Sequence, residues 1–478
     1  MASWRPMLRS ALPPVVVTVV VAAGSYLWLT PWYLNYDTRY AILWGRDLVR
    51  GFSPEYSAAF APTPHPLWTG LGAVAQVFGS HADLAMAWVV LVAFGAMVWL
   101  TYALGAQLFN RWVGLISAAV VLTRPAMNRD VLLAYLDVPF AALIIGAILL
   151  EARRPRRGVG VLVVLAVAGL IRPDAWALSF LYVVYLWRGL AAHDRARFAG
   201  LAPVGPLLWV LSDAVVTGDA LHSLHGTATL AGENDRRRSV SQVPYWTAKY
   251  FIFTLRQPVI LGLPVGLFYA WRQGLRGARL LLLAVAALVA VFAVGPVFGL
   301  PLIGRYIRTP SALLALFYGL ACFGWVSLAP SPARRRWALA GMVCVALSVA
   351  YIPRQSDLLH GTDRRSARDS AFYDDLRKLA QTPRVRAAFA ACPRVTATDH
   401  RPIPFLRWWL GGNPGSVSTT EKHAAPLASL FVIPRRSHIS LSYYGINYPR
   451  KARPPVGYVL VSRDRSWRLY AQPRCVAG

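Results

Sequence analysis

Carboxylates and arginines recur at the ends of long apolar runs in this chain, and their spacing could support one kind of chemistry. The first is Asp37, which directly follows the first apolar run. A carboxylate can accept the proton of an attacking hydroxyl. An arginine can stabilise a departing phosphate, because its planar guanidinium binds two oxygens and keeps its charge. The candidate set is Asp37, Arg39, Arg129, Asp130, Asp137, Arg172, Asp174, Arg305 and Arg308.

Each member also has a structural interpretation. Asp137 lies inside an apolar stretch, where a lone carboxylate is costly, so a functional role is favoured. Asp174 could simply pair with Arg172 at a break between helices. Arg305 and Arg308 fit an interfacial anchor as well as a phosphate ligand. Asp47, three residues before Arg50 on an expected surface helix, is read as half of a solvated ion pair.

A second polar segment, residues 217–247, contributes His222 and His225. Two histidines three residues apart on a helix could share a metal ion, although surface histidine pairs are more common. The sequence therefore predicts no cofactor and no metal site, and a divalent metal stays an open alternative. The arginines at 236–238 fit either a phosphate ligand or a solvated loop.

The elements that must position these side chains are membrane spans. Hydrophobic residues make up 56% of the 478 residues, and apolar runs long enough to cross ~30 Å of hydrocarbon recur throughout. The expected fold class is an all-α polytopic membrane protein with about 11 transmembrane helices over residues 1–353, followed by a small extracytoplasmic α/β domain over 354–478. The expected spans are 12–33, 84–108, 112–127, 132–150, 158–172, 174–188, 200–217, 248–271, 279–300, 309–328 and 335–353.

Arginine clusters predict the orientation. The arginine clusters between the expected spans fall on the same side of the membrane as Arg5 and Arg9, and the positive-inside rule makes that side cytoplasmic. Most acidic residues fall on the opposite side. This places the N-terminus inside and the tail outside a plasma (inner) membrane. The net charge of +29 is then explained by these loops and by anionic lipid headgroups, and nucleic-acid binding is not expected. The cytoplasmic clusters include Arg153, Arg154, Arg156, Arg157, Arg188, Arg195, Arg197, Arg272, Arg276, Arg279, Arg334, Arg335 and Arg336.

The tail is polar and rich in Pro and Arg. Its end, residues 456–463 and 467–471, reads as a β-hairpin. Of the four cysteines, Cys322 and Cys344 lie in apolar runs and are read as packing residues. Cys392 and Cys475 fall in the tail, and an extracytoplasmic location would let them form a disulfide.

Several of these segments, in order, resemble one enzyme superfamily. Residues 37–41 (DTRYA) look like the first-loop motif of lipid A aminoarabinose transferases and protein O-mannosyltransferase-like proteins. Residues 46–51 and 65–68 (HPLW) are similar to a stretch of actinobacterial arabinofuranosyltransferase-like proteins. Residues 136–140 (LDVPF) and 170–174 (LIRPD) resemble two further motifs of the same group. The protein groups that these segments resemble all belong to the GT-C glycosyltransferases, membrane enzymes that use polyprenyl-phosphate sugars.

The resemblance implies transfer of a sugar from a polyprenyl-phosphate donor to a glycan, lipid or protein acceptor of the cell envelope. Asp37 would be the base, and Asp137 would orient the acceptor or share that task. Substrate contacts are expected from Arg39, His65, Arg129, Asp130, Arg172, Asp174, His222, His225, Arg305 and Arg308, with Arg172 and Arg129 on the lipid phosphate.

One position departs from the family pattern. The family often has two adjacent acids in the first loop, and Tyr36 stands where the first would be. If that first acid is the base, this chain is inactive or uses Asp137 instead. This departure keeps open a degenerate scaffold that only binds partners. A transporter or flippase of lipid-linked saccharides is a separate alternative, although charges at the outer rim, and not at mid-membrane, favour the enzyme.

Overall fold

Apolar helices dominate the computed structural model, which describes residues 5–156, 158–421, 428–435 and 453–476. Arg157, one of the loop arginines, lies outside these residues. In the described part, five helices are long and apolar enough to cross a membrane, or up to seven if each of two bent helix pairs is one span. Shorter apolar helices accompany them, so the expected number of eleven stays a prediction. The five are Pro66–Leu108, Ala192–Thr217, Val240–Arg272, Arg276–Phe298 and Gly304–Ser327.

The bundle is built around α4 (Ala82–Leu108), which contacts α1 (Arg5–Trp28), α5 (Arg111–Thr123) and α7 (Asp137–Arg153). Small residues allow close packing, since a Cβ on Gly95 would lie 2.2 Å from the carbonyl oxygen of Thr18 on α1. The other bundle helices are α6 (Pro125–Leu132), α8 (Val159–Gly169), α9 (Asp174–Leu186), α10 (Ala192–Leu201), α11 (Val204–Thr217), α13 (Val243–Arg272), α14 (Arg276–Val294), α15 (Arg308–Phe323) and α16 (Pro332–Ala350).

Breaks in these helices bring polar groups to one end of the bundle. The helices α6 and α7 meet at 118° across residues 133–136, and α8 and α9 are separated at Pro173. A further break in α13 lies at Arg256, whose φ is 67°. The freed carbonyl of Leu255 accepts a hydrogen bond of 2.8 Å from Arg124. Short 3₁₀ segments complete the bundle: η1 (Gln76–His81), η2 (Trp187–Gly189), η3 (Val240–Gln242), η4 (Gly295–Phe298), η5 (Gly304–Ile307) and η6 (Gly324–Ser327).

Three short helices cover that end of the bundle, namely α2 (Tyr36–Val49), α3 (Pro66–Ala75) and α12 (His222–Glu233). Glycines let α2 and α3 touch backbone to backbone. A Cβ on Gly72 would lie 2.2 Å from the carbonyl oxygen of Ala41, and one on Gly45 would lie 2.2 Å from the nitrogen of Ala73. This contact fixes α2, and with it Asp37, against the bundle.

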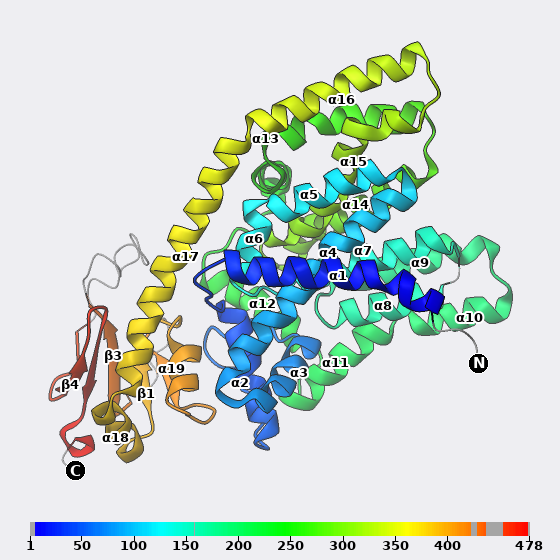
Figure 1. Ribbon diagram of the computed structural model, residues 1–478. Coiled ribbons are helices and arrows are strands. Elements are labelled where there is room, and N and C mark those ends of the chain that lie inside the picture. The colour runs from blue at the N-terminus through cyan, green and yellow to red at the C-terminus, as the bar shows by residue number, and fades with distance from the viewer. Residues whose placement is uncertain (1–4, 157, 422–427, 436–452, 477–478) are drawn as a thin grey trace.

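The tail forms a small α/β unit at the same end (Figure 1). A 30-residue helix, α17 (Ile352–Gln381), leads from α16 to this unit. The sheet has the order β2-β1-β3-β5-β4; β1 is parallel to β2 and β3, and β5 is antiparallel to β3 and β4. Its elements are β1 (Val395–Ala397), β2 (Val417–Thr419), β3 (Leu430–Pro434), β4 (Val459–Arg463), β5 (Trp467–Ala471), α18 (Pro383–Ala391), α19 (Ile403–Trp409) and η8 (Pro473–Cys475).

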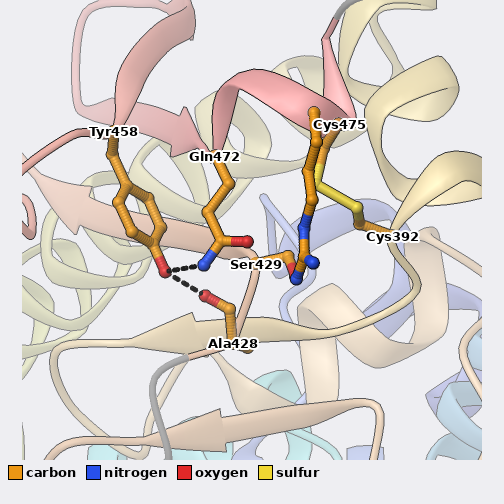
Figure 2. Close-up of a disulfide and its surroundings, with 7 residues drawn as sticks. Cys392, Ala428, Ser429, Tyr458, Gln472 and Cys475 are labelled. Atoms are coloured by element: carbon orange, nitrogen blue, oxygen red, sulfur yellow. Dashed lines mark hydrogen bonds between the residues drawn. A yellow bond between two sulfur atoms is a disulfide. The ribbon is translucent and has the colours of Figure 1, made fainter.

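Strands β4 and β5 are the hairpin expected at the end of the chain. Cys392 follows α18 and Cys475 follows β5, and the two form a disulfide that ties the chain end to the helical side of the sheet (Figure 2). Close by, the hydroxyl of Tyr458 donates to the carbonyl of Ala428 at 2.7 Å. Cys322 and Cys344 are buried and free, as packing residues would be.

The tail and α2 share one hydrophobic core. Tyr40 and Trp44 of α2 belong to the same buried cluster as Phe372, Phe405 and Trp467 of the tail. The boundary expected near residue 353 therefore separates two parts of the chain that are packed together, not two independently exposed units.

A buried ion pair reinforces this contact and corrects one expectation. Asp47 is 1% exposed and accepts hydrogen bonds of 2.6 and 2.7 Å from Arg407 of α19. It is therefore not half of a solvated pair with Arg50. The expectation was wrong because the tail covers this face of α2, and a partner 360 residues away in sequence is not visible in local spacing.

Candidate active site

A cavity of about 690 Å³ lies where α2, α7, α9, η5 and the tail meet. Its lining includes Asp37, His65, Asp137, Arg172 and Arg305, which are far apart in sequence. The tail contributes His400 and Arg401 to the same wall. A cavity of this size, with a mostly apolar wall and a few converging polar groups, is the expected form of a small-molecule site.

The position of Asp37 follows from the start of α2. Asn35 caps this helix by accepting from the backbone N–H of Thr38 at 3.0 Å. The Asn35 amide also donates to the carbonyls of Leu133 at 2.7 Å and Ala134 at 3.1 Å, in the loop before α7. The start of α2 is thus tied to the loop that leads into α7, which brings Asp37 next to Asp137.

Three carboxylates and two guanidinium groups alternate across the cavity. Arg305 donates from Nη1 and Nη2 to Oδ2 of Asp37, each at 3.1 Å, and its Nη1 lies 3.5 Å from Oδ2 of Asp137. Arg172 donates from Nη1 to Oδ1 of Asp137 at 2.5 Å and from Nε to Oδ2 of Asp174 at 3.1 Å. With carboxylates in the majority, this cluster carries one net negative charge before substrate arrives.

Exposure separates the roles of these carboxylates. The side chain of Asp37 is 23% exposed, whereas those of Asp137 and Asp174 are 4% and 9% exposed. Asp37 can therefore reach a hydroxyl in the cavity, while Asp137 and Asp174 hold the two arginines. Burial of Asp137 is tolerated because both cations flank it.

Aromatic rings cover the two guanidinium groups. Tyr306 lies 4.1 Å from Arg172, and Tyr135 lies 4.1 Å from Arg305, measured from ring centroid to Cζ. Such stacking favours the cation and restricts its orientation. Sequence reasoning missed both tyrosines, although each lies within two positions of a predicted site residue. Tyr306 directly follows Arg305, and Tyr135 lies two positions before Asp137.

A second network closes another wall of the cavity. Asp213 of α11 accepts from the backbone N–H of Ser223 at 2.8 Å and from its hydroxyl at 2.9 Å. Trp209 donates to the same hydroxyl at 2.9 Å. Asp213 was not recognised in the sequence. Its signal was the same as that of Asp137, a lone carboxylate within an apolar run.

Tyr36, which stands where the family often has its first acid, lines the cavity as a hydrogen-bond donor. Its hydroxyl donates to the carbonyl of Phe60 at 3.0 Å. Burial, together with Tyr40, raises the pKa of Tyr36 well above its ordinary value, so it stays neutral. It therefore does not replace the missing carboxylate, and Asp37 is the carboxylate that lines the cavity at this end of α2.

His65 precedes α3 and faces the central cluster. Burial lowers its pKa to about 4, with Asp37 opposing and Arg172 reinforcing that shift. The imidazole is neutral near pH 7, and its Nδ1 is buried without a hydrogen-bond partner among the described residues. An unsatisfied ring nitrogen of this kind can accept a hydrogen bond from a bound hydroxyl.

Arg129 also lines the cavity, and its side chain is exposed. Within the part of the chain that the structure describes, it forms no ion pair. Arg172, in contrast, has its guanidinium engaged by both Asp137 and Asp174. Arg129 and Arg236 are therefore cavity cations without an ion pair among the described residues, whereas Arg172 is held between two carboxylates.

Five of the expected site residues lie elsewhere in the described structure. Arg39 is two residues after Asp37, about 200° around the helix, so it faces away and lies 3.6 Å from Asp83. Asp130 and Arg308 form a buried pair of 2.6 Å behind the cavity. His225 is exposed and pairs with Asp219 at 2.8 Å, and His222 lies 3.4 Å from the carbonyl of Tyr56.

These two histidines do not converge on a common ligand. Across the described ranges, no group of three or more His, Cys, Asp or Glu side chains is arranged to hold a metal ion.

Comparisons with solved structures identify the fold. The chain is similar to ArnT from Cupriavidus metallidurans bound to undecaprenyl phosphate, with a TM-score of 0.61 and 15% identity over 97% of this chain and 98% of that one. The apo state of the same protein gives a TM-score of 0.55 at 14% identity, over 98% and 99% of the two chains. An Archaeoglobus fulgidus oligosaccharyltransferase gives 0.52 at 12% identity, over 87% of this chain and 68% of that one.

No protein-family model and no curated protein matches this sequence. The structural likeness to ArnT covers nearly the whole chain, including the tail, and shows that this chain has the same fold. At these identities it establishes the fold, whereas the chemistry rests on the cavity itself.

Proposed function

We propose that this protein is a GT-C glycosyltransferase that moves a sugar from a polyprenyl-phosphate donor to a cell-envelope acceptor. The observation that carries the proposal is the convergence of Asp37, Asp137 and Arg305 on one cavity of about 690 Å³. A base and a fixed cation side by side are what transfer from a phosphate leaving group requires. The ArnT structure with undecaprenyl phosphate supports a lipid of that class as the donor carrier.

The reaction would be a single displacement. The acceptor hydroxyl, held near Asp37 and His65, would attack the anomeric carbon, and its proton would pass to the Asp37 carboxylate. The bond between the anomeric carbon and the phosphate oxygen would break, and the lipid phosphate would leave with the electron pair. Attack opposite to the leaving group inverts the anomeric centre.

Each cation would then have a separate task. Arg129 and Arg305 would stabilise the negative charge that develops on the phosphate. Arg172, itself held by Asp174, would fix Asp137, which in turn contacts Arg305. This assignment differs from the sequence-based one, in which Arg172 itself bound the phosphate, because Arg172 is already occupied by two carboxylates.

Placement in the membrane follows the arginine distribution. We propose that the end of the bundle bearing α2, the cavity and the tail faces the extracytoplasmic side of the plasma membrane, with the N-terminus inside. Asp37 would then lie at the level of the lipid phosphate. The disulfide between Cys392 and Cys475 fits an oxidising compartment on that side.

The proposal is tested by Asp37→Asn. Membranes containing either protein are incubated with radiolabelled polyprenyl-phosphate sugars, and label transferred from the donor is measured. Loss of a general base should lower the rate by about 10²- to 10⁴-fold. Asp219→Asn is the matched control, because Asp219 is exposed and outside the cavity.

Full activity of Asp37→Asn with normal membrane insertion would contradict the proposal. The two alternatives open from the sequence, a flippase and a degenerate scaffold, predict no transfer of label by the unsubstituted protein for any donor in the panel.

A further inference from the structure

A second cavity of about 850 Å³ lies on the other face of α2. It is bounded by α2, η1, α17, α18 and α19, and no described residue lines both cavities. Helix geometry explains the separation: Arg46 is nine residues after Asp37, which places it about 180° around α2. The candidate active site and this second cavity are thus two distinct spaces on either side of one helix.

The second cavity is strongly cationic. Arg46, Arg50, Arg377 and Arg386 line it, with Asp83 as its acid. Asp83 already lies 3.6 Å from Arg39, and the Arg377 pair with Asp374, 3.1 Å, is half-exposed. Within the described residues, Arg50 and Arg386 are exposed and take part in no ion pair. Positive charge therefore remains available for an anion.

Arg46 supplies a buried, preorganised cation in this wall. It is 6% exposed, and its Nη2 donates to the carbonyls of Gly412 at 2.7 Å and Arg407 at 3.4 Å. Its Nε is buried and has no partner in the described structure. The charge of this buried guanidinium adds to the positive potential of the cavity wall, which favours an anionic ligand.

Two adjacent tryptophans face the same space. Trp408 and Trp409 are half-buried, and both line the cavity. Arg46 lies over Trp408 at 5.3 Å, and Arg39 lies over Trp409 at 6.0 Å, which restricts both rings. The negative face of an indole ring attracts the partly positive C–H groups of a sugar ring. Tryptophan beside arginine is therefore suited to a saccharide that carries negative charge.

The rim of the cavity adjoins an apolar surface. Gln76, Gly79 and Ser80 of η1 line the cavity, while Val77 and Phe78 of the same segment are 84% and 59% exposed. Just before them, Val74 of α3 is 63% exposed. Exposed apolar groups at the edge of a polar pocket mark contact with lipid or another apolar partner. This segment runs directly into the apolar helix α4.

We propose that this second cavity binds the anionic saccharide headgroup of a membrane lipid. The carboxylate or phosphate contacts Arg50 and Arg386, with the buried charge of Arg46 behind them, and the sugar ring lies against Trp408 and Trp409. The acyl chains leave along Val77 and Phe78. The assignment depends on this cavity alone and holds whether or not Asp37 is a catalytic base.

The proposed lipid binding is tested by native mass spectrometry of the purified full-length protein. Two lipids that differ at one carbon are used. Glucuronosyl diacylglycerol carries a carboxylate where glucosyl diacylglycerol carries a hydroxymethyl group. The protein, mixed with equal amounts of both, should retain about tenfold more of the charged lipid. A charge-assisted hydrogen bond has that magnitude.

The substitution that removes this preference is the pair Arg50→Gln and Arg386→Gln. Both side chains are exposed and unpaired in the described structure, so the fold should persist. Arg384→Gln is the matched control on α18, because a separation of two residues turns Arg384 about 200° away from Arg386. The double variant should bind both lipids equally, and the control should keep the wild-type preference.

Three outcomes would overturn the proposal. One is equal retention of the two lipids by the unsubstituted protein. Another is an unchanged preference in the double variant, which would place the binding in the other cavity. The third is displacement of the lipid by an equal concentration of methyl glucuronide, which would show that a soluble saccharide, and not a lipid, is the ligand.

Discussion

Arg305 bridges Asp37 and Asp137: its guanidinium lies 3.1 Å from the first carboxylate and 3.5 Å from the second. One cation thus sets the distance between the exposed acid and the buried one. Arg305→Lys keeps the charge but loses the planar fork that reaches both. We expect its transfer rate to fall by about 10²-fold, since fixed cations at a leaving group have effects of that order.

The measurement is the initial rate of sugar transfer in membranes. Arg154→Lys, in an exposed loop after α7, is the control and should leave that rate unchanged. Wild-type activity in Arg305→Lys would show that bidentate contact with the two carboxylates is unnecessary.

His65 predicts a pH dependence of stability. Its pKa is lowered to about 4 in the folded protein, against ~6.5 in an unfolded chain. The folded state therefore binds fewer protons than the unfolded state between these values. The contribution of His65 to stability is full above pH ~6.5 and is lost as the pH falls toward 4.

His65→Gln removes this titration. The Tm of the wild-type protein in detergent should decline more steeply from pH 6.5 to 4 than the Tm of the variant does. Parallel declines would show that the imidazole is not buried as the structure has it.

The pair of Asp47 and Arg407 predicts that the tail is held to α2 by a desolvated contact. Arg407→Gln leaves Asp47 buried without its cation and should destabilise by about 3 to 5 kcal/mol, whereas Asp47→Asn should cost less, because Arg407 keeps Glu55 at 3.7 Å. The double variant should lose less than the sum. Asp374→Asn with Arg377→Gln is the control, because that pair is about half-exposed and should contribute under ~1 kcal/mol.

Thermal unfolding and limited proteolysis between the bundle and the tail would measure these effects. Additive losses at positions 47 and 407 would mean that the two side chains do not interact in solution.

Glycines on α3 offer a test of how α2 is seated. A Cβ at Gly72 would lie 2.2 Å from the carbonyl oxygen of Ala41, whereas one at Gly70 would meet nothing within 4 Å. Gly72→Ala should therefore displace α2, lower the Tm and reduce transfer at the same time. Gly70→Ala, two positions away on the same helix, should be neutral or slightly stabilising. Tm and transfer rate are measured on both variants, and equal behaviour would argue against the close contact.

Local sequence reasoning found Asp37, Asp137 and Asp174 and offered the pairing of Asp174 with Arg172, but it did not predict the partners of Asp37 and Asp137. Asp137 could be identified because a charge inside an apolar run is rare on energetic grounds. Asp213 has the same signature within 200–217 and was overlooked. Asp137 pairs with Arg305, and Asp213 pairs with Ser223. Both contacts depend on how helices distant in sequence meet, which no local pattern encodes.

One residue was assigned to the site wrongly because every residue of a motif was expected to contact substrate. Arg39 belongs to the same short motif as Asp37, yet helix geometry turns it toward Asp83 and Phe405. Asp47 was assigned to Arg50 from their spacing, because the sequence gives no sign that the tail buries this face. The hairpin β4–β5 could be predicted since its signal is contained within sixteen residues.

The connection between α16 and α17 has a mechanical consequence. The two helices meet at a 45° bend with Tyr351 between them, so no slack linker joins the bundle to the sheet (Figure 1). A helix of 30 residues is about 45 Å long. At that length, a tilt of a few degrees at the bend would shift the far end of α17 by several ångströms. Because the tail is also packed against α2, a displacement of the sheet would act on the bundle at two places at once.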